Sequence, residues 1–88
     1  MAIIIIPATL REFCAGASKI EVSGTTIREV LREVDARCPG FFARVVEEDR
    51  RLRPELAFAI NGEVYPLGLH DPVAPDTEIA IVPALGGG

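Results

Sequence analysis

The feature that most constrains the fold is a single change of hydrophobic period, at residue 26 of an 88-residue chain. Before it, residues 3–6 are four consecutive isoleucines and residues 19–23 alternate polar and apolar side chains, which predicts a buried strand and a half-buried strand joined by a turn or short loop at 8–17. From residue 26 the apolar side chains recur at helical spacing and share one face: Ile27, Val30, Leu31, Val34 and Cys38. One main amphipathic helix must therefore cover whatever sheet the strands form.

The ends of this helix, predicted over residues 26–38, carry local signals. Thr25 or Thr26 can cap its start, and Glu29 lies three residues after Thr26, which is the spacing of a capping box. Pro39 and Gly40 follow directly and end it. A shorter helical segment over residues 41–46 adds more apolar side chains to the core.

The second half of the chain predicts three more strands. Residues 47–54 are the most polar stretch and predict a surface loop. Two strands at 56–60 and 63–65 flank Asn61-Gly62, a pair that favours the tight turn of a β-hairpin. After an irregular segment, the last strand covers residues 78–82.

Both faces of that last strand are apolar, which predicts a central position in the sheet. If it lies beside the first strand, the helix becomes the crossover between the two halves. The fold class is therefore α+β, with a mixed sheet of four or five strands and one main helix packed across it.

Charge and composition exclude several functions. The net charge of −4 argues against a general nucleic-acid role, because neutralising phosphates needs a basic surface. The apolar run near the start is too short to span a bilayer, and no signal peptide precedes it, so we predict a cytoplasmic protein without a membrane partner.

Candidate catalytic and metal-binding residues are few. Cys14 and Cys38 are too few for a disulfide framework, and with a lone His70 they do not make a set of four metal ligands. We expect Cys38 to pack as a small hydrophobic residue, with no redox or nucleophilic role for either cysteine. We expect His70 to be a surface or loop residue, since no catalytic triad can be assembled around it from the sequence.

The chain closes with Ile81-Val82-Pro83-Ala84-Leu85-Gly86-Gly87-Gly88. Glycine-rich ends are common where a terminus is not packed. The alternative is that the terminal carboxylate is the reactive group and the glycines make it reachable. Because glycine lacks a Cβ atom, such a tail can enter a channel that a branched residue would block.

This ending resembles the C-terminus of the ThiS/MoaD family of ubiquitin-like sulfur carriers, which have a β-grasp fold. A turn at residues 75–77, an apolar strand, a proline and a terminal diglycine at Gly87-Gly88 follow the pattern of that family. The start of the chain, residues 3–16, and the helix also resemble the family, and Pro7, Leu10 and Arg11 are most similar to the CysO type.

The resemblance implies a carrier rather than an enzyme. A ThiF/MoeB-like activating enzyme would use ATP to adenylylate Gly88, a sulfur donor would convert it to a thiocarboxylate, and a biosynthetic enzyme would accept the sulfur. It implies a β-grasp domain at 1–83 and a flexible tail at 84–88, with no bound cofactor or metal. The tail would contact the partner enzymes through the residues that lead to Gly88: Pro83, Ala84, Leu85, Gly86 and Gly87.

The accepting enzyme stays open at this point. It could be a cysteine synthase or another thiolating enzyme, or the chain could be the small subunit of molybdopterin synthase. A ubiquitin-like modifier would use the same terminus to form an isopeptide bond, and a binding module would not need a free terminus. Lys19, the single lysine, argues against a chain built to receive many conjugates.

Overall fold

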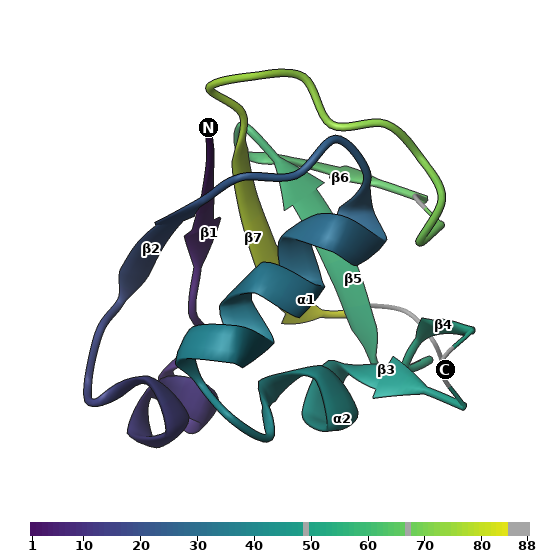
Figure 1. Ribbon diagram of the computed structural model, residues 1–88. Coiled ribbons are helices and arrows are strands. Elements are labelled where there is room, and N and C mark those ends of the chain that lie inside the picture. Colours follow the sequence, from purple (N-terminus) through teal and green to yellow (C-terminus); the bar gives the residue numbers. More distant parts are fainter. Residues whose placement is uncertain (49, 67, 85–88) are drawn as a thin grey trace.

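A computed structural model describes residues 1–48, 50–66 and 68–84. Along the chain it forms β1 (Ala2–Ile5), a 3₁₀ helix η1 (Ala8–Cys14), β2 (Lys19–Val22), α1 (Ile27–Arg37), α2 (Phe41–Val45), β3 (Val46–Glu47), β4 (Arg51–Leu52), β5 (Leu56–Ile60), β6 (Glu63–Tyr65) and β7 (Glu78–Pro83). Five strands make one sheet in the order β2-β1-β7-β5-β6, and α1 crosses one of its faces (Figure 1). This is the α+β architecture that the sequence predicts.

The first and last strands lie side by side at the centre of the sheet. β1 and β7 are parallel, with Ile4 opposite Ile79, while β2 and β5 pair antiparallel on their outer sides. Ile4 and Ile79 are both fully buried on the face that α1 covers. The prediction of a central last strand is confirmed. Along the chain, α1 lies between the strands β1 and β2 and the strands β5, β6 and β7, as expected for the crossover.

The start of α1 has the predicted Thr26 cap, but the carboxylate of Glu29 binds Thr25 instead of the Thr26 amide. Thr26 is the N-cap, and its hydroxyl oxygen accepts a hydrogen bond from the Glu29 amide at 3.2 Å. The Glu29 carboxylate reaches one residue further back than a capping box requires, accepting from both the amide and the hydroxyl of Thr25 at 2.9 and 3.0 Å. These bonds favour the charged carboxylate and lower the pKa of Glu29 below its ordinary value.

The turn between β5 and β6 is the tight hairpin predicted from sequence. Asn61 and Gly62 both have positive φ angles, 49° and 91°, which is the requirement of the turn that Asn-Gly favours. Within the described residues, no helix has the length and apolar character needed to cross a membrane.

Two segments differ from the sequence prediction in local structure. Residues 8–17 contain the seven-residue 3₁₀ helix η1 rather than only a turn or loop. The predicted surface loop at 47–54 contains β3 and β4, which form a small antiparallel sheet in which Glu47 lies opposite Arg51. The Arg51 guanidinium donates to the Glu47 carboxylate at 2.8 Å, an interaction across the strands that hydrophobic period alone does not reveal.

The prediction that Cys38 packs as a free thiol is wrong. Cys14, the last residue of η1, and Cys38, the C-cap of α1, form a disulfide with their Cα atoms 4.7 Å apart. The sequence shows only two isolated cysteines 24 positions apart. The fold brings them together because η1 packs beneath the end of α1.

Candidate functional site

The candidate site begins where β7 ends. Pro83 pairs with Leu56 at the start of β5, and the amide of Ala84 then donates to the carbonyl oxygen of Glu55 at 2.8 Å. Ile79 and Ile81 are buried in the core, whereas Pro83 is exposed. The last described residues therefore leave a well-anchored central strand at one end of the sheet (Figure 1).

Two of the predicted site residues can be placed in this way. Pro83 is exposed at the end of β7 and Ala84 is half-buried against the segment between β4 and β5. The other predicted residues lie outside the described residues: Leu85, Gly86, Gly87 and Gly88. Their expected roles stay predictions.

The surface next to Pro83 and Ala84, here called the tail base, is apolar. Ala57, Val64, Val82 and Pro83 line a shallow cavity of about 400 Å³ on the face of the sheet opposite α1. Val64 is 65% exposed, one of the few large apolar side chains at the surface. This exposed apolar surface therefore adjoins the end of β7.

The side chain of a cationic residue near Glu55 in sequence points toward α2. Arg53 is two residues before Glu55, and its terminal nitrogen donates to the Ala43 carbonyl oxygen at 2.9 Å. Its Nε is buried and makes no hydrogen bond within the described part of the chain. The sequence showed Arg53 only as part of a charged loop, so neither this position nor the Glu55 contact could be predicted.

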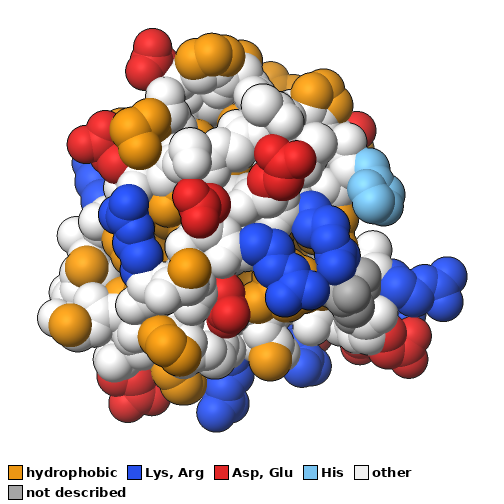
Figure 2. All heavy atoms as spheres, viewed as in Figure 1, with side chains coloured by type: hydrophobic (Ala, Val, Ile, Leu, Met, Phe, Trp, Pro, Cys, Tyr) orange, Lys and Arg blue, Asp and Glu red, His pale blue; other side chains and the backbone are white. Residues whose placement is uncertain are grey.

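Groups that could perform catalysis are sparse in the described residues. No set of three His, Cys, Asp or Glu side chains that could hold a metal ion occurs there. The disulfide removes both thiols as nucleophiles, and His70 is exposed in the segment before β7. On the face that Figure 2 shows, acidic and basic side chains are interspersed rather than separated into a single-sign stripe.

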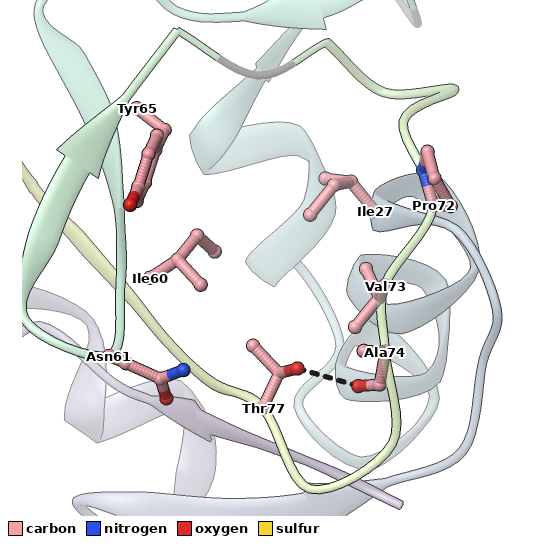
Figure 3. Close-up of a pocket in the computed structure, with 8 residues that line it drawn as sticks. All are labelled: Ile27, Ile60, Asn61, Tyr65, Pro72, Val73, Ala74 and Thr77. Carbon is pink, nitrogen blue, oxygen red and sulfur yellow. Dashed lines mark hydrogen bonds between the residues drawn. The ribbon is translucent and has the colours of Figure 1, made fainter.

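A second cavity lies at the opposite end of the sheet. It has a volume of about 370 Å³, is open to the surface, and is lined by residues of α1, the β5–β6 hairpin and the segment before β7 (Figure 3). At its edge, the Thr77 hydroxyl donates to the Ala74 carbonyl oxygen at 2.6 Å. Thr77 precedes β7 and Pro83 ends it, so the strand separates this cavity from the tail base by roughly 20 Å at its ordinary rise per residue.

The family comparison covers this whole arrangement, from β1 to the last glycine. The model of the ThiS family matches residues 4–88. The chain belongs to the ThiS family. As a ThiS-family protein it has a sulfur-carrier type of domain, small and substrate-like rather than built around catalytic side chains.

Solved structures agree on the β-grasp fold. A chain in the crystal structure of the BexX/CysO complex of Amycolatopsis orientalis is 30% identical, with a TM-score of 0.86 and 100% of both chains covered. CysO of Mycobacterium tuberculosis is 24% identical over 97% of this chain and 100% of that one, with a TM-score of 0.85, which supports the fold alone.

Small archaeal modifier protein 1 of Methanosarcina acetivorans shares the fold at a TM-score of 0.73. It is 25% identical, with 99% of this chain and 95% of that chain covered. The comparison with curated proteins gives no match.

Proposed function

We propose that this ThiS-family protein carries sulfur as a thiocarboxylate on Gly88. The observation that supports the proposal most strongly is that the family match includes the terminal diglycine, which follows directly from the central strand β7. The Ala84–Glu55 hydrogen bond at 2.8 Å anchors the chain four residues before Gly88. Four residues follow Ala84, which gives a reach of roughly 13 Å when fully extended.

The chemistry requires a partner for every covalent step. A carboxylate is a poor electrophile, so an activating enzyme of the ThiF/MoeB type would join Gly88 to AMP and release pyrophosphate from ATP. A sulfur donor then displaces AMP and leaves a thiocarboxylate, whose sulfur is nucleophilic. This chain would contribute the terminal carboxylate and its presentation.

Tail composition suits delivery into an enclosed site. Gly86, Gly87 and Gly88 have no Cβ atoms, so the tail is thin and free to adopt the backbone angles that a channel imposes. Ordering this tail costs about 1–2 kcal/mol per residue in backbone entropy. Contacts from Pro83, Ala84 and Leu85 to the partner would offset part of that cost.

The accepting partner is a sulfur-using biosynthetic enzyme, and the 30% identity to a chain of the BexX/CysO complex favours an acceptor of the kind that CysO-type carriers serve over a molybdopterin synthase. As the small subunit of molybdopterin synthase, the chain would use the same tail. Binding of the thiocarboxylate form to each type of acceptor would separate these possibilities.

The test is the intact mass of the protein after incubation with ATP, sulfide and a ThiF/MoeB-like enzyme from the same source. We expect a mass increase that matches replacement of one oxygen by sulfur, located at Gly88 by fragmentation. A chain lacking both Gly87 and Gly88, which no longer ends in a diglycine, and a chain extended past Gly88 are the matched controls, and both should stay uncharged. Charging of either control would contradict the assignment of the terminal carboxylate.

A protein modifier is the second candidate, favoured by the similarity to a small archaeal modifier protein. It would use the same activated Gly88 but form an amide with a lysine of a target protein. Conjugates of higher mass that contain a Gly88–lysine linkage would support this function. Sulfur transfer without such conjugates would support the carrier.

A further inference from the structure

The Cys14–Cys38 disulfide lies at the same end of the molecule as the base of the tail. β1 and β7 are parallel, so the segment that follows β1 and the segment that follows β7 leave the sheet at one end. The helix η1 follows β1, and Cys14 is its last residue. Figure 1 shows η1 below the end of α1 at this end of the sheet.

The disulfide is the strongest connection between η1 and the helices above it. Within the described part of the chain, the hydrogen bonds of residues 7–17 all stay inside the segment 6–18. None of them reaches α1 or α2, so apart from the disulfide η1 is attached by side-chain packing.

That packing is small in extent. Phe13 lies against Gly40, whose position would place an added Cβ atom 3.4 Å from the Phe13 ring. The guanidinium carbon of Arg44 lies 5.1 Å from the centre of the same ring. Leu10 is partly buried against the core. Regions with few buried contacts and local hydrogen bonds are those that open without global unfolding.

We propose that Cys14 and Cys38 form a reversible redox site that controls the local order of η1. In the oxidised state the bond fixes η1 to the end of α1. In the reduced state the segment is held only by side-chain packing, that of Cys14 in the core and of Leu10, Phe13 and Ala17 against it, and η1 opens locally while the sheet stays folded. The end of the molecule from which the tail leaves then has two states.

The reductant is a dithiol, and the exchange balances in two steps. One thiolate of the dithiol attacks the Cys14 sulfur, the bond to Cys38 breaks, and Cys38 leaves as a thiolate that takes up a proton. The second thiol of the dithiol, as a thiolate, then attacks the first sulfur of the same dithiol, which is bonded to Cys14 in the mixed disulfide. This releases Cys14 as a thiolate, which is also protonated. The protein pair gains two electrons and two protons, and the dithiol becomes a disulfide.

Burial sets the order of these events. Cys14 is 7% exposed and Cys38 is 1% exposed, so attack requires a brief opening of η1, and Cys14 is the first sulfur to become accessible. Reduction should therefore be slow and should not speed up in proportion to the dithiol concentration once opening limits the rate. This inference does not depend on what the tail carries.

The experiment is hydrogen exchange measured by mass spectrometry on one protein in two states, oxidised and reduced with dithiothreitol. Alkylation after unfolding counts the thiols and confirms each state. We expect the amides of residues 8–17 to lose nearly all protection after reduction, while those of β1, β5 and β7 stay protected and exchange faster only to the extent that the global free energy of unfolding falls. Removal of dithiothreitol and reoxidation should restore slow exchange.

The matched control is the double variant Cys14→Ala/Cys38→Ala. It should resemble the reduced protein and should not respond to dithiothreitol. Equal exchange of residues 8–17 in both states would overturn the proposal. Complete loss of protection over the whole sheet would also overturn it, because the disulfide would then hold the fold together rather than govern η1.

Discussion

The strand β7 and the residues that continue it use opposite kinds of side chain. Ile79 and Ile81 point into the core between α1 and the sheet, and both are at most 4% exposed. Two residues further on, Pro83 is exposed, and the chain ends in three glycines that have no side chains to pack. One continuous stretch of ten residues thus passes from the centre of the core to the proposed reactive terminus.

The difference teaches that stability and the proposed chemistry reside in separate residues of one strand and its extension. Substitutions in the folded part should change the free energy of unfolding by amounts set by burial, bonding and backbone strain. Substitutions in the terminal glycines should change charging without changing the free energy of unfolding.

The largest expected effect is that of Ile79→Asp. The side chain is fully buried, so the charge would have no water and no partner, and the free energy of unfolding should fall by more than about 4 kcal/mol. Circular dichroism should show an unfolded protein. The matched control is Ala80→Asp on the half-exposed opposite face of the same strand, which should stay folded. A cooperative, unshifted melting curve for Ile79→Asp would contradict this account of β7.

The Cys14→Ala/Cys38→Ala variant should show the next largest loss. The disulfide closes a loop over 24 positions, and the chain-entropy estimate for such a loop is about 3.5 kcal/mol. Chemical denaturation of the oxidised wild type and the variant measures this difference. In dithiothreitol the two proteins should approach each other, and a variant as stable as the oxidised protein would show that the bond adds nothing.

A smaller loss is expected for Gly24→Ala. Gly24 has φ of +150°, and an added Cβ atom would lie 2.9 Å from the backbone nitrogen of Val30. Strain of this kind costs about 1–3 kcal/mol. Gly16→Ala is the control, because Gly16 also has a positive φ but open space around it, so it should lose less. Equal melting temperatures for the two variants would show that the contact with Val30 relaxes freely.

The smallest effect on stability is expected from Glu29. The hydrogen bonds from Thr25 lower the pKa of Glu29 in the folded state. The contribution of Glu29 to the free energy of unfolding is therefore fully present above the ordinary pKa of 4.5, and it is lost as the pH falls through the lowered pKa. Glu29→Gln should be slightly less stable than the wild type at pH 7. The melting temperatures of the variant and the wild type should converge in acid. A difference that grows on acidification would contradict a lowered pKa of Glu29 in the folded state.

Much of the fold could be predicted because local patterns and global packing agree. The change of period at residue 26, the Thr26 cap, and the Asn61-Gly62 turn each specify one element, and the apolar faces of β7 place it at the centre of the sheet. Each pattern reports a backbone conformation that nearby residues largely decide.

The missed features depend on contacts between distant segments. The disulfide joins residues 14 and 38 only because η1 packs beneath α1. The carbonyl of Glu55 holds Ala84 through the backbone, so no side chain marks it in the sequence. The pairing of Arg51 with Glu47 in β3–β4 joins two charges that looked like a solvated loop.

The central claim is that stability and the proposed chemistry reside in separate residues. The most direct test measures both the unfolding midpoint and the yield of thiocarboxylate for the variant Gly87→Val. Both are read from one preparation, with the wild type beside it. We predict the same unfolding midpoint as the wild type and no thiocarboxylate at Gly88, because a branched side chain would block entry of the tail, while the last buried core residue of the described chain is Ile81. Full charging, or a clearly lower midpoint, would contradict the separation of stability from chemistry.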